Sequence, residues 1–367
     1  MKTVRMVLVG GFLGAGKTTL MAIAGRRLAA RGMQVGFITN DQAGELVDTA
    51  LLKQTGIEVK EVAGACFCCK FEELILRTGE FSAHRQPDVL MTEPVGSCTD
   101  LSATVLQPIK KFYGDKFRVA PFSVVVDPSR LKELLNDPDG LFSYNVMYVY
   151  SKQLEEADCI VLNKTDQLSE SEIQDLKLQL THKFPNAQII TLSAVTGTGV
   201  DEWLDIILKD SPAGRNILEI DYDKYAEGEA KLGWLNTAVK LQAVASQDWK
   251  AFAFELLRRF KDQFKFKKAE VAHLKLFITA EGTGLVGNLT STRGMPFVFV
   301  NGKAGIDSTH ALMILNARVH MDPIALRASV EDVFDHVREK GTRIDVVSME
   351  CFSPGRPKPT HRFSEVV

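Results

Sequence analysis

The first residues that could do chemistry form a glycine-rich turn near the start of the chain. The turn reads Gly10-Gly11-Phe12-Leu13-Gly14-Ala15-Gly16-Lys17-Thr18-Thr19 and follows an apolar run. Counted from its second glycine, it has the spacing of a phosphate-binding loop between a strand and a helix. Backbone N–H groups of such a loop face a phosphate, and the helix N-terminus adds positive potential. The candidate phosphate-binding residues are Gly11, Gly14, Ala15, Gly16, Lys17, Thr18 and Thr19.

Further residues are candidates for binding Mg²⁺ and the γ-phosphate beside this loop. A lysine at the position of Lys17 reaches the β- and γ-phosphates, and the hydroxyl of Thr18 holds Mg²⁺. Glu93 ends an apolar run, where its carboxylate can hold Mg²⁺ through water or polarise an attacking water. Gly96 lets a backbone N–H approach the γ-phosphate. Asp41 also follows a predicted strand, and it serves either as a switch or Mg²⁺ residue or as a helix cap. The candidate catalytic residues are Lys17, Glu93 and Asp41.

A cysteine cluster lies between these two acidic residues in the sequence. It reads Cys66-Phe67-Cys68-Cys69, and three thiolates so close together can converge on one soft cation only from an irregular loop. Three protein ligands leave a fourth position open, which suits a metal that arrives and leaves. A redox-active pair, Cys68-Cys69, and three buried thiols packed as small apolar groups remain as alternatives. We expect Cys98 to be a packing residue rather than a ligand.

A later strand end indicates which nucleotide binds. Asn163-Lys164-Thr165-Asp166 follows the apolar run 159–162. An Asp carboxylate only accepts hydrogen bonds, so it matches the N1 and N2 donors of guanine, whereas adenine offers a mismatched edge. Ser193-Ala194, after another predicted strand, is similar to a loop that supports guanine O6 through a backbone N–H. The candidate guanine-binding residues, which favour GTP over ATP, are Asn163, Lys164, Asp166, Ser193 and Ala194.

The elements that must position these residues alternate along the chain. Apolar, β-branched runs recur at residues 4–9, 35–39, 89–91, 122–126, 159–162 and 189–192, with room for helices between them. This rhythm predicts an α/β fold with a mostly parallel sheet and helices on both faces. The first helix is expected at about Thr18 to Arg31, directly after the glycine-rich turn.

The predicted domain boundary rests on a change in composition after residue 211, where proline, glycine and charged residues become frequent. We expect a phosphate-loop domain over 1–212, a linker over 213–231 that is rich in charge, and a smaller α+β domain over 232–352. Predicted strands in the second domain are 239–244, 274–278, 297–300, 311–319 and 344–347, and predicted helices are 249–264 and 329–338. The proline-rich segment 353–367 is expected to be mobile.

Composition excludes several classes of protein. The 367 residues carry 44 Lys and Arg against 46 Asp and Glu, which gives no electrostatic reason to expect a nucleic acid partner. The sequence has neither an apolar run long enough to span a membrane nor a signal-peptide core at its start. We therefore expect a cytoplasmic protein without a membrane partner. Six cysteines in a chain of this length are no disulfide framework.

Together these motifs resemble the CobW-like P-loop GTPases, relatives of the hydrogenase and urease nickel chaperones. The resemblance rests on the glycine-rich turn, Cys-x-Cys-Cys, Glu-x-x-Gly and Asn-Lys-x-Asp, in that order over about the first 210 residues. It implies GTP hydrolysis coupled to transfer of a metal, often zinc, or to cobalt insertion in cobalamin synthesis. It further implies a client metalloprotein or cobalamin-related enzyme, Thr18 and Glu93 near Mg²⁺, a switch around Asp41, and a homodimer as one compatible assembly. The metal ligands it implies are Cys66, Cys68 and Cys69.

Three departures from the family pattern limit these expectations. Gly64-Ala65 stands where Asn-Gly is common, and the seven histidines are dispersed, which excludes metal storage by a histidine-rich tract. Pro94-Val95-Gly96 after Glu93 replaces the usual Thr-Ser-Gly form. A specialised subgroup therefore stays open, in which the chain is a GTP-gated docking or activation protein for a corrinoid or methyl-transfer enzyme. Its cysteines would then be structural or redox-active.

Overall fold

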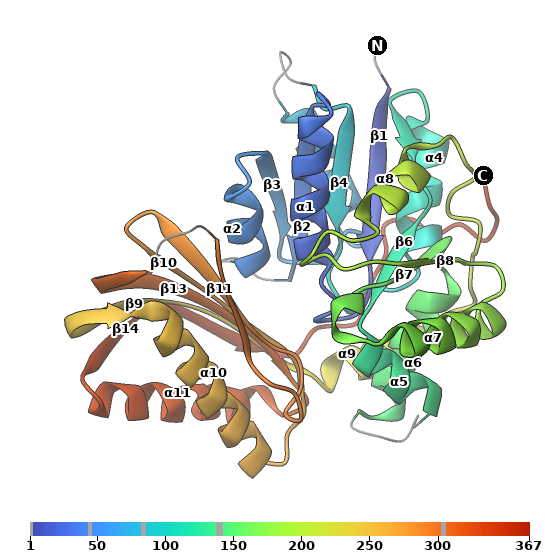
Figure 1. Cartoon of the computed structure of the whole chain (residues 1–367). Helices are drawn as coiled ribbons and strands as arrows, with labels where there is room; N and C mark the ends of the chain where they lie inside the picture. Colours follow the sequence, from blue (N-terminus) through green and yellow to red (C-terminus); the bar gives the residue numbers. More distant parts are fainter. Residues whose placement is uncertain (1–2, 43–45, 82–85, 137–141, 302–305) are drawn as a thin grey trace. The chain divides into compact units, whose positions relative to one another are not determined.

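The computed structural model describes residues 3–42, 46–81, 86–136, 142–301 and 306–367 (Figure 1). The chain forms two compact units. The first comprises Met1–Gln42, Thr55–Gly228 and Arg356–Val367, and the second comprises Ala43–Gln54 and Glu229–Gly355. The chain therefore enters the second unit twice, once briefly after residue 42 and once after residue 228.

The first unit is built on a parallel sheet, as the sequence predicts. Its eight described strands follow the order β3-β2-β4-β1-β6-β7-β8, with β5 beside β1. Six of them match the predicted apolar runs, which are buried because helices cover parallel sheets on both faces. The strands are β1 (Val4–Gly10), β2 (Val35–Asp41), β3 (Glu58–Ala63), β4 (Val89–Glu93), β5 (Phe117–Val119), β6 (Ser123–Val126), β7 (Cys159–Leu162) and β8 (Gln188–Thr191).

Helices connect these strands. The first, α1, begins at Lys17, immediately after the glycine-rich turn, and packs across β1, β2 and β4 (Figure 1). The helices of this unit are α1 (Lys17–Ala30), α3 (Phe71–Gly79), α4 (Gln107–Tyr113), α5 (Pro128–Asn136), α6 (Tyr144–Glu155), α7 (Glu170–Lys183) and α8 (Val200–Leu208), with a π-helical turn η2 (Ser102–Leu106) and a 3₁₀ turn η3 (Thr165–Gln167). The boundary between the units falls within α9 (Tyr222–Ala230).

The second unit is an antiparallel sheet with helices, which agrees with the predicted α+β domain. Its six described strands follow the order β12-β11-β10-β13-β9-β14. Figure 1 shows α10 and α11 side by side along this sheet. The elements are β9 (Gly233–Asp248), α10 (Trp249–Phe266), β10 (Val271–Ala280), β11 (Thr283–Leu289), β12 (Phe297–Asn301), β13 (Asp307–Val319), α11 (Pro323–Glu339) and β14 (Thr342–Phe352), together with α2 (Val47–Lys53) from the earlier segment.

The two faces of the second sheet bury different helices. Leu276 and Ile278 on β10 belong to the main core, which also contains Phe260 of α10. Phe277, between them on the strand, instead forms a small cluster with Val47 of α2. Since successive strand residues point to opposite faces, α2 lies on the face away from α10 and α11.

Two predicted segments differ from what the structure contains. Residues 213–228 of the expected linker 213–231 belong to the first unit. There Asp158 accepts hydrogen bonds from the backbone N–H groups of Gly214 (2.6 Å) and Arg215 (3.1 Å). The expected mobile segment 353–367 has no helix or strand, yet its last twelve residues belong to the first unit. There the backbone N–H of Phe363 donates to Ala103 O at 3.0 Å. Composition alone does not indicate such anchoring contacts.

None of the described helices combines the length and the apolar character that crossing a membrane requires.

Candidate functional site

The glycine-rich turn forms a tight loop between β1 and α1. Gly16, at the N-terminus of α1, has φ 97°, in the left-handed region that favours glycine. A Cβ added there would lie 2.4 Å from the side-chain nitrogen of Asn163, so the position also requires glycine for space. The ammonium group of Lys17 donates to Gly11 O at 2.9 Å and to Phe12 O at 3.4 Å. The loop therefore holds a buried cation at the N-terminus of α1, which suits an anionic phosphate.

Four of the predicted residues meet beside this loop. The Thr18 hydroxyl donates to Glu93 Oε1 at 3.1 Å, and Lys17 Nζ lies 3.8 Å from the same oxygen. Glu93 reaches this place because β4 lies next to β1, and all three side chains are buried. A Cβ added to Gly96 would lie 3.1 Å from Lys17 Nζ, so this backbone also approaches the loop. A hydroxyl and a carboxylate are the oxygen donors that Mg²⁺ prefers, and these residues fit that ion.

Asp41, the third candidate catalytic residue, ends β2. Its side chain accepts a hydrogen bond from the N–H of Gln42 at 2.6 Å, and its carbonyl accepts one from Gly64 N at 3.1 Å. The helix cap that the sequence leaves open for this residue is absent, since α2 begins after Leu46. Residues 43–45 of the predicted switch segment lie outside the described residues. Asp41 therefore joins the start of the cysteine loop rather than a helix.

The cysteine cluster occupies an irregular loop between β3 and α3, as three converging thiols require. The sulfur of Cys66 lies 2.9 Å from that of Cys68 and 3.2 Å from that of Cys69, and the latter two are 3.7 Å apart. All three sulfurs lie within 4.8 Å of one another. Two of the cysteines are buried, and Cys69 is partly exposed. Such a set can hold one soft or borderline cation.

Asn40, which the sequence analysis does not identify as a site residue, shapes this loop. Its side-chain amide donates to Val62 O (2.8 Å) and Ala65 O (2.7 Å), and its Oδ1 accepts from Phe67 N (2.8 Å). These bonds hold the backbone on both sides of Cys66. Asn40 lies on β2 immediately before Asp41, so its place at a strand end is visible in the sequence, but its bonds are not.

The three thiols differ in pKa. Hydrogen bonds from Cys68 and Cys69 lower the pKa of Cys66 well below its ordinary value. The bond to Cys66, together with burial, raises the pKa of Cys68 well above its ordinary value and that of Cys69 to about 11. Cys66 is thus the most acidic of the three thiols, and a cation that binds all three as thiolates must displace their protons.

The predicted guanine-binding residues form one hydrogen-bonded group. Asn163 donates from its side-chain nitrogen to Ala15 O at 2.8 Å, and its Oδ1 accepts from Ala194 N at 2.9 Å. The Ser193 hydroxyl donates to Asp166 Oδ1 at 2.6 Å. Asn163 therefore ties the phosphate loop to the loop at Ala194.

Lys164 has a partner that the sequence analysis does not identify. The residue has φ 60°, uncommon for a non-glycine residue, and its ammonium pairs with Asp127. Although burial opposes it, this lysine holds the pKa of Asp127 below its ordinary value. The Asp127 side chain also accepts from Ser129 N at 2.7 Å, as a cap of α5 does.

This geometry agrees with the family to which the sequence is similar. The family model described as CobW/HypB/UreG, nucleotide-binding domain, matches residues 5–191. The chain belongs to this family. The match spans the phosphate loop, the cysteine loop and the Asn-Lys-x-Asp strand end, and it ends before Glu229–Gly355, the larger segment of the second unit.

Two curated proteins to which the chain is similar are named zinc chaperones. The chain is 29% identical over 216 residues to zinc chaperone CobW of Pseudomonas aeruginosa, covering 50% of this chain and 54% of that protein. It is 30% identical over 179 residues to zinc chaperone YeiR of Escherichia coli, covering 47% and 50%. The chain thus spans about half the length of the curated relatives it matches.

Solved structures of the family are distant. HypB from Helicobacter pylori in complex with nickel is 16% identical, covering 56% of this chain and 86% of that one, with a TM-score of 0.42. Zn(II)-bound YjiA GTPase from Escherichia coli is 15% identical, covering 91% and 99%, with a TM-score of 0.33.

The C-terminal segment lies against the cysteine loop of the CobW/HypB/UreG domain. The backbone N–H of Lys358 donates to the sulfur of Cys69 at 3.2 Å. Thr360 donates from its N–H to Cys68 O at 2.8 Å and from its hydroxyl to Cys69 O at 3.3 Å. Two residues further, Arg362 donates to Asp100 Oδ2 at 2.7 Å. The segment therefore supplies a hydrogen-bond donor to a candidate ligand, which stabilises negative charge on that sulfur.

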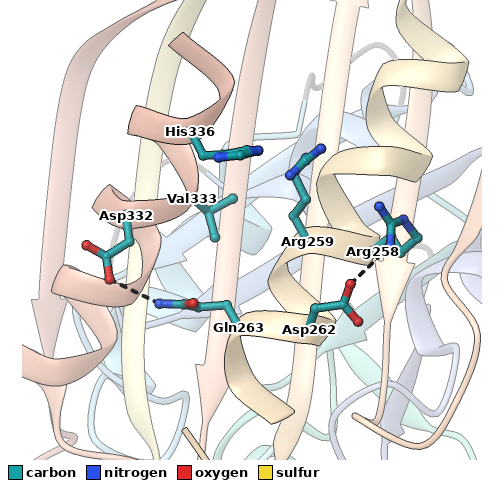
Figure 2. Close-up of a pocket in the computed structure, with 7 residues that line it drawn as sticks. All are labelled: Arg258, Arg259, Asp262, Gln263, Asp332, Val333 and His336. Atoms are coloured by element: carbon teal, nitrogen blue, oxygen red, sulfur yellow. Dashed lines mark hydrogen bonds and ion pairs between the residues drawn. The ribbon is translucent and has the colours of Figure 1, made fainter. Parts of the chain in front are cut away.

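The second unit has a surface pocket that shares no residues with this site. It lies between α10 and α11, has a volume of about 370 Å³, and contains none of the predicted site residues (Figure 2). Arg258 forms an ion pair with Asp262 at 3.1 Å, and the neutral amide of Gln263 donates a hydrogen bond to Asp332 at 3.0 Å. These contacts give it the character of a solvated helix surface.

Proposed function

We propose that this chain is a Mg²⁺-dependent GTPase that couples GTP binding and hydrolysis to the binding and delivery of a metal ion. The cargo is a zinc- or cobalt-type cation held by Cys66, Cys68 and Cys69. The recipient is a client metalloprotein or a cobalamin-related enzyme. Family membership supports the nucleotide part, and the names of the curated relatives support zinc as the cargo.

The observation that carries this proposal is the shared support of the two sites. Asn40 binds the backbone on both sides of Cys66. The next residue, Asp41, binds Gly64 through its carbonyl. Two residues before Asp41, Thr39 is paired in register with Glu93, whose carboxylate accepts from Thr18. A shift of the end of β2 on nucleotide binding therefore reaches the cysteine loop through short hydrogen bonds.

The chain's residues have distinct roles in hydrolysis. Lys17 binds the β- and γ-phosphates, the N–H groups of the loop surround them, and Asp166 selects guanine. Thr18 and Glu93 hold Mg²⁺, which when bound neutralises charge that develops on the phosphates. Glu93 also lies where a carboxylate can orient the attacking water.

The decisive experiment measures metal affinity in two nucleotide states. Reduced, anaerobic protein is titrated with Zn²⁺ against a competing chelator in the presence of a Mg-GTP analogue or Mg-GDP. We expect the Zn²⁺ affinity to differ between the two nucleotide states. The triple variant Cys66→Ser, Cys68→Ser, Cys69→Ser should lose this nucleotide-dependent Zn²⁺ binding. Because coupling is reciprocal, Zn²⁺ must also change the ratio of GTP-analogue affinity to GDP affinity by the same factor.

Matched controls separate the sites. Cys159→Ser and Cys351→Ser change cysteines that lie outside the cluster and should leave both affinities unchanged. Competition with ATP tests the nucleotide. Identical Zn²⁺ affinities with GTP analogue and GDP, or full client activation by the triple variant, would instead establish a GTP-gated docking protein with structural or redox cysteines.

A further inference from the structure

A fourth cysteine lies beside the cluster. Cys98 is 1% exposed and comes from a different part of the chain, the turn that follows β4. Its thiol is a hydrogen-bonding neighbour of the Cys66 thiol. It stands outside the group whose three sulfurs all lie within 4.8 Å of one another, so it approaches the cluster from the side of Cys66.

The turn that carries Cys98 is fixed by specific hydrogen bonds. Cys98 N donates to Val95 O at 2.9 Å. Gln153, buried on α6, donates to Gly96 O at 3.1 Å and to Cys98 O at 2.8 Å. Thr99 N donates to the hydroxyl of Tyr225 at 3.3 Å. A buried amide side chain thus holds the backbone of the turn, which places the Cys98 thiol against Cys66.

We propose that Cys98 is the fourth thiolate ligand of the metal site formed with Cys66, Cys68 and Cys69. This inference rests on the proposed metal-binding function and names one more ligand of the same site. Four thiolates satisfy a tetrahedral zinc ion, whereas the three loop cysteines alone leave one position open. In a tetrahedron with Zn–S bonds of about 2.3 Å, sulfurs lie about 3.8 Å apart. The loop sulfurs, now 2.9 to 3.7 Å apart, need to separate by less than about 1 Å. The Cys98 sulfur lies more than 4.8 Å from at least one of them and needs to approach it by about 1 Å or more.

The position of Cys98 gives the nucleotide a direct route to the metal. Five residues before it in the same segment is Glu93, which accepts from Thr18, and two residues before it is Gly96, beside Lys17. A movement of Gly96 toward a γ-phosphate moves the Cys98 thiol with it. We expect four thiolates to close the site in the GDP state and GTP to open it to three, so that the cargo becomes transferable.

The test counts sulfur ligands by X-ray absorption at the zinc edge. Full-length, reduced protein is loaded with one equivalent of Zn²⁺ in Mg-GDP. We expect four sulfurs at about 2.3 Å in the wild type. We expect three sulfurs and one lighter atom in Cys98→Ser, while the matched control Cys159→Ser, another buried cysteine of the same unit, retains four.

Affinity gives a second measurement on the same proteins. Cys98→Ser should weaken Zn²⁺ binding by more than about tenfold, because loss of even a hydrogen-bonding partner of a ligand costs a metal site about 10- to 100-fold. Far-UV circular dichroism and thermal unfolding verify that Cys98→Ser and Cys98→Ala remain folded. The wild-type sulfur count decides the question even where a variant does not fold.

The outcomes separate this inference from the proposed function. Three sulfurs in the wild type, with zinc still bound, would overturn Cys98 as a ligand and leave the metal carrier intact. No zinc binding by the wild type would overturn both. Four sulfurs with both Mg-GDP and the Mg-GTP analogue would overturn the opening of the site by GTP.

Discussion

At the residue scale, Gly16 is a strongly constrained position of the nucleotide site. Its backbone is left-handed, and an added Cβ would lie 2.4 Å from the side-chain nitrogen of Asn163. Gly16→Ala should therefore displace Asn163 from its bonds to Ala15 and Ala194 as well as strain the loop. We expect GTP-analogue affinity to fall by more than about tenfold, since two hydrogen bonds are at stake. Isothermal titration calorimetry provides the measurement.

Gly32 supplies the matched control for this prediction. It also has a left-handed backbone, φ 82°, but nothing lies within 4 Å of an added Cβ. Gly32→Ala should cost about 1 kcal/mol of stability through the backbone alone and leave nucleotide affinity unchanged. Equal losses of affinity in the two variants would show that contact with Asn163 is irrelevant.

Glu156 predicts a pH dependence of stability. Burial raises the pKa of this carboxyl to about 8, against hydrogen bonds from Ser102 and Thr99 that lower it. Because the folded pKa lies above the unfolded value, the folded state retains a proton that the unfolded state has lost. The free energy of unfolding should therefore fall as pH rises from about 5 to 8, by up to about 1.4 kcal/mol per unit, and then level off.

Chemical denaturation of Glu156→Gln at several pH values tests this prediction. The neutral amide cannot titrate, so the variant should lack this fall, and its stability relative to the wild type should rise steadily up to about pH 8. Parallel pH profiles of the two proteins would contradict a raised pKa. A constant offset between them would only measure the altered hydrogen bonds.

The sequence shows which residues could form the site, but it does not show all of their hydrogen-bond partners. Lys17, Thr18, Glu93 and Gly96 were predictable as one group because a phosphate-binding loop and a strand end have recognisable spacing. The contact of Cys66 with Cys98 was not predictable, since it depends on how the turn after β4 is folded. The role of Asn40 was hidden for the same reason: its bonds go to backbone atoms of another strand and loop.

At the element scale, the C-terminal segment differs most from its prediction, because it is anchored to the first unit by hydrogen bonds. Its prolines exclude regular structure, as the sequence indicates, but its N–H groups still bind the cysteine loop and η2. Edge strand β3, with the sequence Glu-Val-Lys-Glu-Val-Ala, was missed because it is mostly half-buried and lacks an apolar run. β11 was missed because Gly284 and Gly287 interrupt its pattern. β5 was missed as well, since its three residues form no apolar run. Runs of buried β-branched residues made the remaining strands of both sheets predictable.

A single N–H can be removed to test the contact of this segment with Cys69. Lys358→Pro deletes the donor to the Cys69 sulfur, and the following Pro359 already favours an extended backbone at residue 358. We expect Zn²⁺ affinity to fall about tenfold or more, because one hydrogen bond to a charged group contributes about 1.5 to 3 kcal/mol. Lys358→Ala, which keeps the N–H and loses the same side chain, should bind Zn²⁺ like the wild type. Equal affinities in all three proteins would show that the segment is only a passive cover.

At the scale of the whole molecule, one connection between the two units follows directly after Asp41 and Gln42, at the end of β2. The short excursion into the second unit begins directly after Gln42 and ends before β3, which leads into the cysteine loop. The excursion contains α2, which follows the proposed switch at Asp41 in the chain and leads through β3 to the cysteine loop. The two-domain plan was predictable from composition, but this exchange was not, because a seven-residue helix carries no signal of the sheet to which it binds.

Helix α2 is firmly attached within the second unit. Val47 is fully buried against Phe277 and Val286. Its backbone N–H donates to Asn316 Oδ1 at 3.0 Å, and Asp48 pairs with Lys275. If the second unit senses or restrains the nucleotide state, this helix is the element through which it acts.

Val47→Asp tests that role, because an unpaired carboxylate in this apolar cluster should detach α2. We expect GTP analogue and Zn²⁺ each to bind, but the ratio of Zn²⁺ affinities in the two nucleotide states to fall toward one. Lys53→Asp places the same side chain on an exposed position of the same helix and should preserve the ratio. Calorimetric titrations of both variants in Mg-GDP and Mg-GTP analogue give the four affinities required. An unchanged ratio in Val47→Asp would mean that coupling runs wholly through Asn40, Asp41 and the turn after β4, within the first unit.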